Sequence, residues 1–307
     1  MDADSRILVT GGSGFLGRNF TAHLKSLGHQ NVRSLSSKDL DLCDFGAVKD
    51  YFGAYKPEYC FFFAGLVGGI KANSKNPIEF YTKNSLIAIN SFRAAELVKP
   101  KKCLYLGSSC IYPKFADQPF KEEALLTGSL EPTNEAYALA KIGGVKLASH
   151  YHKSNRLNII SAMPPNIYGP GDNFDLEDSH VLSALVRRYH EAKCDGSPFV
   201  TLWGTGSPLR EFIYVDDLSR ALTTVMNSYD GSSHINVGSA QEVSISRLAM
   251  MVKEVVGYEG EVLWDDSMPD GFPRKMMDNS KLFSLGFSPQ VSLMSGISKT
   301  YESFLKG

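Results

Sequence analysis

The sequence has little net charge and no long apolar run. Its formal net charge is −1 over 307 residues, so there is no electrostatic ground for binding nucleic acid or an anionic membrane. The longest apolar run, 59–70, is too short and too rich in glycine to span a bilayer. The first predicted strand begins at Arg6, which leaves little length for a signal or transit peptide. We therefore expect a cytoplasmic protein that binds neither nucleic acid nor membrane.

Cysteine is also scarce, and its spacing predicts neither disulfides nor a metal site. The five cysteines stand at 43, 60, 103, 110 and 194, an odd number without a framework spacing, which suits a reducing compartment. No pair has the spacing of zinc ligands, and His150 and His152 would point to different faces of a helix. We expect no metal.

The first half of the chain alternates short apolar runs with helical patterns. Strands are predicted at 6–10, 32–35, 59–64, 102–107 and 158–163, and helices between them include 45–55, 77–98 and 137–152. Such alternation predicts an α/β fold with a doubly wound parallel sheet. Ligands of these sheets bind beyond the carboxyl ends of the strands, so motifs that follow the strands should converge on one cleft.

The rhythm changes after Pro164, where the second half begins. A helix is predicted at about 180–193, a strand at 210–215, a helix through Met226 capped by Asp216 or Asp217, a helix at 244–256 and a strand near 260–264. No linker separates the halves. We expect 1–166 plus about 211–238 to bind the cofactor, and about 167–210 plus 239–307 to form a smaller, interleaved substrate domain.

Glycines at 11, 14 and 17 follow the first strand and open a helical pattern. A turn of this kind lets the backbone approach a pyrophosphate at a helix N-terminus; the alternative is a turn that binds nothing. An acid after the second strand would favour NAD, but this chain has Ser36-Ser37-Lys38 before its first acid, Asp39. Hydroxyls and an ammonium suit a 2′-phosphate, with Arg18 as a second cation, so we expect NADP unless Lys38 is merely solvated.

A carbonyl-binding set follows the fourth strand. Tyr137 and Lys141 lie four residues apart on one helix face, where the ammonium would lower the pKa of the phenol and let it exchange a proton with a carbonyl oxygen. Ser108 would bind the same oxygen. Two residues further along a predicted extended segment, Cys110 would face the same side. The alternatives are a buried tyrosine beside a surface lysine and a small core cysteine.

Together these motifs resemble the extended short-chain dehydrogenase/reductase family over essentially the whole chain. Within it they are similar to the GDP-L-fucose synthases. The segments that carry the narrower resemblance are 67–70, 107–113, 131–134, 169–174, 179–181 and 200–204. One departure is Gly171, where the pattern Gly-Pro-His-Asp-Asn-Phe has a histidine.

The resemblance implies an NADPH-dependent enzyme that epimerises C3 and C5 of GDP-4-keto-6-deoxy-D-mannose and then reduces C4. It also implies a homodimer through the helices at 77–98 and 137–152. Cys110 would be the epimerisation base and His180 the acid, beside Ser108, Tyr137 and Lys141. A related sugar-nucleotide 4-reductase or epimerase without double epimerisation, and a catalytically silent NADP-binding regulator, are the alternatives.

The same resemblance implies the ligand contacts. For the substrate they are Arg188, Trp203, Arg210 and Asp270, whereas Arg187 reads as a solvated neighbour. For NADP they are Gly11, Gly12, Ser13, Gly14, Phe15, Leu16, Gly17, Arg18, Ser37, Lys38, Asp41, Leu42, Ala64, Gly65, Leu106, Gly107, Ser108, Tyr137, Lys141, Pro164, Asn166, Ile167 and His180.

Overall fold

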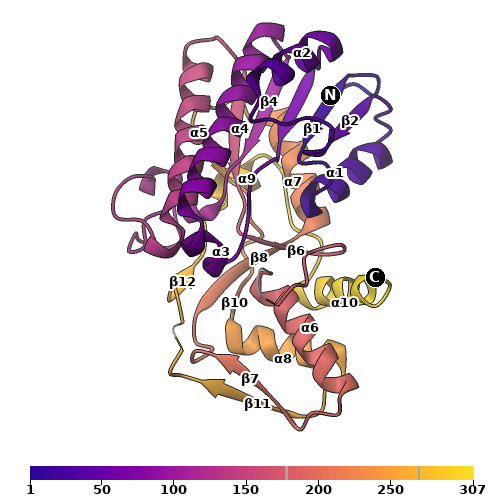
Figure 1. Cartoon of the computed structure of the whole chain (residues 1–307), viewed down its shortest axis with the longest axis vertical. Coiled ribbons are helices and arrows are strands. Elements are labelled where there is room, and N and C mark those ends of the chain that lie inside the picture. Colours follow the sequence, from indigo (N-terminus) through magenta and orange to yellow (C-terminus); the bar gives the residue numbers. More distant parts are fainter. Residues whose placement is uncertain (177–178, 269) are drawn as a thin grey trace.

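A six-stranded parallel sheet forms one half of the computed structural model, which describes residues 1–176, 179–268 and 270–307. The strand order is β2-β1-β3-β4-β5-β9 (Figure 1). The strands are β1 Ile7–Thr10, β2 Val32–Leu35, β3 Tyr59–Phe62, β4 Lys102–Leu106, β5 Ile159–Met163 and β9 Ile235–Asn236. The predicted doubly wound α/β fold is confirmed. Because β2 and β3 flank β1, the winding direction reverses beside the glycine turn that follows β1.

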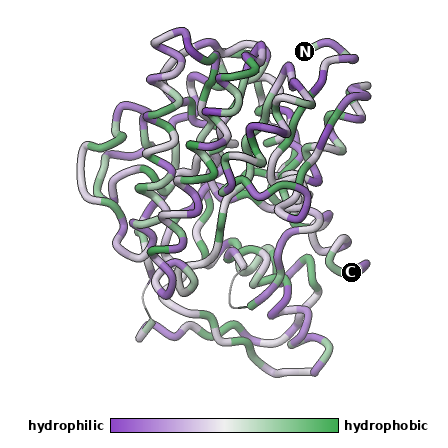
Figure 2. The backbone as a smooth tube through the Cα atoms, turned by 45° about the horizontal axis from the view of Figure 1, so that its top comes forward, coloured by the Kyte–Doolittle hydropathy of each residue, from purple (hydrophilic) through white to green (hydrophobic). Residues whose placement is uncertain are grey.

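Helices cover both faces of this sheet. On one face α2 Phe45–Tyr55, α4 Pro77–Val98 and α5 Glu135–Lys153 pack on alternate strand residues such as Leu8. On the other, α1 Phe15–Ser26 and α7 Val215–Ser228 pack on the intervening ones, such as Ile7 and Val9. Strand side chains alternate between faces, so both faces of each central strand must be apolar. Figure 2 shows hydrophobic, green stretches of chain running through the interior of this half.

The second half is built around β8 Leu209–Tyr214. Along one edge β8 pairs with β6 Asn166–Tyr168 and β12 Arg274–Lys275, and along the other with β10 Glu242–Ser244. A parallel pair, β7 Phe199–Trp203 and β11 Glu261–Asp265, lies at the end of the molecule remote from the large sheet (Figure 1). Three helices pack in the apolar cluster of this half: α6 Val181–Cys194, α8 Ile245–Val256 and α10 Leu293–Phe304.

The remaining elements are short. They are α3 Ile70–Lys75, α9 Ser280–Ser284 and the 3-10 turns η1 Ser109–Ile111, η2 Glu122–Ala124 and η3 Pro132–Asn134. Within the described ranges, the chain has no helix whose length and apolarity would let it cross a membrane.

One predicted helix cap is wrong. Helix α7 begins at Val215 after Tyr214, so Asp216 and Asp217 lie inside its first turn rather than at its cap. The Asp217 carboxylate is buried and accepts hydrogen bonds of 3.0 Å from two backbone amides, at 290 and 291. That carboxylate therefore connects α7 to the segment before α10. Local helix-capping patterns could not predict this contact, because the partners are distant in sequence.

Candidate active site

The glycine turn after β1 is closely packed against the neighbouring strands. Gly11 has φ +72°, and a Cβ atom there would stand 2.8 Å from the backbone nitrogen of Ala64. A Cβ on Gly17 would stand 2.2 Å from the Gly11 carbonyl oxygen. Helix α1 follows directly, and its N-cap residue is Gly14, which has no side chain that could cap the first turn. The free amides of that turn, which include those of Phe15 and Leu16, are suited to a phosphate group.

The segment after β2 presents hydroxyls and one ammonium. Ser36 donates to the Asp39 carboxylate from its amide at 2.8 Å and from its hydroxyl at 2.6 Å, and these bonds lower the pKa of Asp39. The first acid after the strand is therefore turned toward its own backbone, while Ser37 and Lys38 are exposed. Asp41 accepts from the Cys43 amide at 2.9 Å. The backbone carbonyl of Leu42 accepts from Asn90 at 3.0 Å.

Arg18 links the glycine turn to a loop of the second half. Its guanidinium donates to the carbonyl oxygens of Ser13 at 2.6 Å and Gly171 at 2.8 Å. Gly171, the departure from the family pattern, has φ +77°, and a Cβ there would stand 3.2 Å from Arg18 Nη2. In this structure Arg18 therefore fastens the two halves together.

Ser108 and Cys110 lie at the carboxyl end of β4, in a geometry that differs from the prediction. Residues 109–111 form a 3-10 turn rather than an extended segment, and Ser108 caps it by accepting a 3.4 Å hydrogen bond from the Cys110 amide. The prediction that an extended segment places Ser108 and Cys110 on the same side is therefore wrong. The chain turns here, and the Ser109 amide donates to the Pro164 carbonyl at 3.1 Å. The Cys110 side chain is buried in the apolar cluster on the α5 face of the sheet.

Tyr137 and Lys141 project from α5 toward the same corner. The Lys141 ammonium donates to the Leu106 carbonyl at 2.9 Å and lies 5.7 Å from the centroid of the Tyr137 ring. Gly65 is also close, since a Cβ on it would stand 3.6 Å from Lys141 Nζ. Cys110 is near enough to influence the ionisation of both Tyr137 and Lys141.

Burial dominates the ionisation of this pair. It raises the pKa of Tyr137 well above its usual value, with Cys110 and Tyr105 acting in the same direction. It lowers the pKa of Lys141 to about 8. The expectation that Lys141 lowers the pKa of Tyr137 is therefore wrong for this structure, because desolvation of the phenolate outweighs any help from the ammonium. The phenol is held protonated, which is the form of an acid.

His180 stands at the N-cap of α6, but its side chain makes no capping hydrogen bond. Its charged neighbour is Asp172, which accepts from the Asn173 amide at 2.8 Å and from the Ser183 hydroxyl. Burial raises the pKa of Asp172, whereas the Ser183 hydrogen bond and the charge of His180 lower it. The exposed imidazole thus faces a carboxylate that α6 itself holds in place.

The predicted substrate residues divide into two groups. Arg210 on β8 and Asp270 lie close together: burial lowers the pKa of Arg210, and the Asp270 carboxylate opposes that effect. Asp270 is fixed by Thr205, which donates from its amide at 2.7 Å and its hydroxyl at 2.8 Å. Arg188 on α6 is half-buried and Trp203 at the end of β7 is 53% exposed.

The remaining predicted cofactor residues follow the ends of strands. Gly12 packs against β2, Gly107 follows β4, and Pro164 follows β5. Asn166 and Ile167 begin β6, where the Asn166 amide donates to the Glu211 carbonyl at 3.0 Å. These residues surround the carboxyl ends of the parallel strands, as expected for one cleft.

Sequence reasoning missed two buried or partly buried charges in the same region. Glu211 is fully buried and accepts hydrogen bonds from three groups, the amides of Ala240 and Met277 and the side chain of Asn279. Lys275 on β12 is paired in register with Arg210. Local sequence patterns could not have identified either residue, because the contacts of both are with residues distant in sequence.

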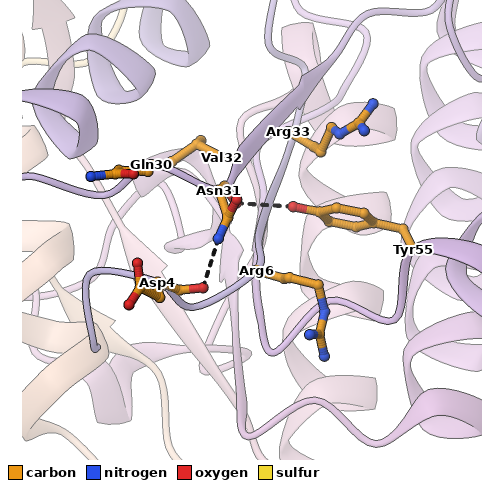
Figure 3. A pocket seen from close by; sticks show the side chains of 7 residues that line it. All are labelled: Asp4, Arg6, Gln30, Asn31, Val32, Arg33 and Tyr55. Atoms are coloured by element: carbon orange, nitrogen blue, oxygen red, sulfur yellow. Dashed lines mark hydrogen bonds between the residues drawn. The ribbon is translucent and has the colours of Figure 1, made fainter.

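A cavity of about 320 Å³ lies at the amino ends of β1 and β2, whereas the predicted site residues follow the carboxyl ends of the strands. Figure 3 shows the Tyr55 hydroxyl directed at the Asn31 carbonyl, which accepts its hydrogen bond at 2.9 Å. The lining residues are Asp4, Arg6, Gln30, Asn31, Val32, Arg33 and Tyr55, none of which was predicted for the site. Among the described residues, no three His, Cys, Asp or Glu side chains are placed to hold a metal ion.

The fold is that of a doubly wound α/β protein with a closely packed glycine turn after its first strand. The family model for the "NAD dependent epimerase/dehydratase family" matches residues 7–238. The chain therefore belongs to the NAD dependent epimerase/dehydratase family, and the family resemblance noted in the sequence is confirmed.

The chain is also similar to individual proteins of known name or structure. The Arabidopsis thaliana protein GDP-L-fucose synthase 1 is 50% identical over 305 residues, which are 99% of this chain and 94% of that protein. A GDP-6-OMe-4-keto-L-xylo-heptose reductase from C. jejuni superposes with TM-score 0.95 at 32% identity, covering 100% of this chain and 99% of that one. A GDP-L-fucose synthetase from Naegleria fowleri bound to NADP gives TM-score 0.92 at 29% identity, covering 100% and 95%.

Proposed function

We propose that this protein is a GDP-L-fucose synthase. It epimerises C3 and C5 of GDP-4-keto-6-deoxy-D-mannose and then reduces the C4 ketone with NADPH to give GDP-L-fucose. The observation that carries this proposal is the position of Cys110, which is buried in the apolar cluster against which Tyr137 packs and which influences the ionisation of Lys141. A ketone reductase needs Ser108, Tyr137 and Lys141 only, whereas a base in this position adds the means to remove protons next to the ketone.

The epimerisation requires a base and an acid on opposite sides of the sugar ring. The 4-keto group acidifies the protons on C3 and C5. Cys110, as thiolate, takes the proton from one carbon, and the bonding electrons move to the C4 oxygen as an enolate. Ser108 and Tyr137 stabilise that oxygen with hydrogen bonds. His180 then delivers a proton to the opposite face of the same carbon, which inverts it.

The reduction uses the same carbonyl site. Bound NADPH supplies a hydride to C4, and the residues that fit it are the glycine turn, the segment of Ser37 and Lys38, and Lys141. The closely packed turn at Gly11 and Gly17 and the uncapped start of α1 are suited to its pyrophosphate. Tyr137 gives its proton to the new C4 hydroxyl, and its raised pKa keeps that proton available.

The nucleotide end of the substrate fits the second half. Guanidinium groups bind diphosphate with matched geometry, and Arg188 and Arg210 are the two we assign to it. Trp203, with its exposed ring, packs on the base or ribose. Asp270 orients Arg210 and is itself held by Thr205.

Three further features of the proposal concern organisation. Residues 1–166 plus about 211–238 serve the cofactor, and about 167–210 plus 239–307 serve the substrate. A homodimer forms through α4 and α5. The exposed apolar side chains of α4 include Ile78, Tyr81, Leu86, Ile89 and Leu97, and α5 adds Leu139. The protein works in the cytoplasm, where its five free cysteines stay reduced.

Incubation with GDP-4-keto-6-deoxy-D-mannose and NADPH in D2O tests the activity. Loss of absorbance at about 340 nm together with GDP-L-fucose deuterated at C3 and C5 is the expected result. A product reduced at C4 but without deuterium at either carbon would favour a simple C4 reductase, which the similarity to the heptose reductase makes the second candidate. Absence of turnover would favour another sugar nucleotide or a silent NADP-binding protein.

A further inference from the structure

Lys275 brings an ammonium group to the cleft from the far end of the sequence. It ends β12, where it pairs in parallel register with Arg210 of β8. Its ammonium lies 5.7 Å from the centroid of the Phe272 ring. Within the described ranges this ammonium makes no hydrogen bond or ion pair, although burial lowers the pKa of Lys275. A partly buried cation of this kind needs a partner to offset its desolvation.

The chain around Lys275 is fastened to the segment that follows Cys110. The Met276 amide donates to the Gln118 side chain at 2.9 Å, and the Phe120 amide donates to the Met276 carbonyl at 2.8 Å. Met277 packs in the same apolar cluster as Cys110 and Phe120. Residues two apart on an extended segment share a side, so Lys275 projects toward the Cys110 side of the segment, as Met277 does.

Among the groups that influence the ionisation of Lys275, the Cys110 thiol is the one that can serve as a partner for its ammonium. Three groups influence the ionisation of Lys275: Cys110, Arg210 and Glu131. Arg210 repels the ammonium, and Glu131 is already paired with Lys114 at 2.9 Å. The other groups whose ionisation Cys110 influences are Tyr105 of β4 and two α5 residues, Tyr137 and Lys141. Lys141 is committed to the Leu106 carbonyl.

We propose that Lys275 is a positioning residue for the epimerisation, and that its ammonium holds Cys110 as the thiolate that removes the C3 and C5 protons. The inference rests on the proposed function. In each step the thiolate becomes a thiol and the electron pair of the C–H bond moves to the C4 oxygen, while Lys275 keeps its proton throughout. A cation beside a thiol favours its ionised form.

The direct test is the ionisation of Cys110, followed by thiolate absorbance near 240 nm as the pH rises. The signal of each variant is corrected by the same variant carrying Cys110→Ser. For Lys275→Met, the midpoint of the Cys110 titration should rise by about one pH unit or more, and Lys275→Arg should restore it. Lys253→Met is the matched control, because Lys253 lies on α8 near the Tyr258 ring and should leave the midpoint in place.

Kinetics supply the second readout. With GDP-4-keto-6-deoxy-D-mannose, deuterium exchange at C3 and C5 by Lys275→Met should slow about tenfold at neutral pH through kcat, and recover as the pH is raised. An unchanged midpoint in a folded Lys275→Met protein would overturn the inference. So would a loss confined to KM, which would make Lys275 a substrate anchor. If Lys275→Met does not fold, Lys275→Gln takes its place under the same criteria.

The two proposals fail separately. If the wild-type protein leaves the GDP-sugar unchanged but the Cys110 midpoint still depends on Lys275, the proposed function is wrong while the electrostatic link stands. If the wild-type protein makes GDP-L-fucose and Lys275→Met titrates as wild type does, only the inference is wrong.

Discussion

The ammonium of Lys141 donates a 2.9 Å hydrogen bond to the carbonyl oxygen of Leu106, the last residue of β4. The bond joins the helix that carries Tyr137 to the strand that leads into Ser108, so the two sides of the carbonyl site share one anchor. It is made inside the protein, where Lys141 is only 4% exposed.

Replacing this lysine should stabilise the protein while ending its activity. The pKa of Lys141 is lowered to about 8 from 10.5 in the unfolded chain, so below about pH 8 the folded state carries a charge that burial disfavours. Lys141→Met should raise the free energy of unfolding at pH 7 by about 1–3 kcal/mol. The gain should shrink as pH rises from about 8 to 10.5, over which the wild type itself gains stability. Denaturant unfolding at several pH values measures this, and a destabilised Lys141→Met at pH 7 would contradict it.

Tyr137→Phe removes the proposed acid and changes little else. Reduction should fall by at least about a hundredfold in kcat, because the C4 oxygen then has no phenol from which to take a proton. Absorbance at about 340 nm follows the reaction. Tyr51→Phe on α2 is the control, since Tyr51 packs on Tyr55 and is assigned no part in the carbonyl chemistry. Undiminished turnover would remove Tyr137 from its role.

Cys110→Ala and His180→Ala should separate the two reactions. Deuterium exchange at C3 and C5 should be lost in both, by at least about a hundredfold, while NADPH still binds. Product NMR after reaction in D2O measures the exchange, and fluorescence quenching measures NADPH binding. Exchange at wild-type rates in both variants would show that neither side chain moves the proton.

Gly17→Ala should weaken cofactor binding through the shape of the turn. The added methyl would meet the Gly11 carbonyl oxygen at 2.2 Å, so the turn must shift. The Kd for NADPH should rise by about tenfold or more, a loss of about 1.4 kcal/mol. Gly53→Ala in α2 is the control, because nothing lies within 4 Å of its Cβ position, and it should raise stability slightly. Equal NADPH affinity in both variants would contradict the assignment of the turn.

His234 should set an acid limit to stability. Burial, with help from Lys281 and Lys146, lowers the pKa of His234 to about 4 from 6.5 in the unfolded chain. The unfolded state therefore binds more protons between these values, and stability falls as the pH drops from about 6.5 to 4. His234→Gln should remove up to about 3 kcal/mol of that pH dependence. The Gln side chain can keep a bond to the Tyr112 hydroxyl, now 3.0 Å from the imidazole. If the free energy of unfolding fell by the same amount in both proteins as the pH dropped below 6, the prediction would be wrong.

Local sequence patterns predicted the large sheet well. Strand β2 and helices α2 and α4 have the predicted bounds, and the other strands of the first half begin or end within two residues of them. These elements are readable because apolar periodicity and glycine punctuation act over a few neighbouring residues. The strand β9, only two residues long, was missed because its pairing with β5 supplies most of what makes it a strand.

Part of the candidate site could also be predicted from local sequence patterns. Gly11, Ser108, Tyr137 and Lys141 follow strand ends or share a helix face, and parallel strands bring such positions together in any doubly wound fold. The 3-10 turn at Cys110 was not predicted, because it is accompanied by a hydrogen bond from the Ser109 amide to the carbonyl of Pro164, a distant residue that directly follows β5. The ionisation of Tyr137 was misjudged because spacing reveals a neighbouring charge but not the depth of burial.

The sequence of residues 1–163 by itself contains the alternating strand and helix patterns, the glycine turn and the Tyr137–Lys141 helix spacing. These patterns are enough to predict the fold class and the carbonyl site. Tertiary contacts alone brought the charge of Lys275 within reach of Cys110, that of His180 within reach of Asp172, and the partners of the buried Glu211 to β8. The physical reason is that periodicity is a property of neighbours in sequence. Desolvation and charge pairing depend on which distant segments the folded chain brings into contact.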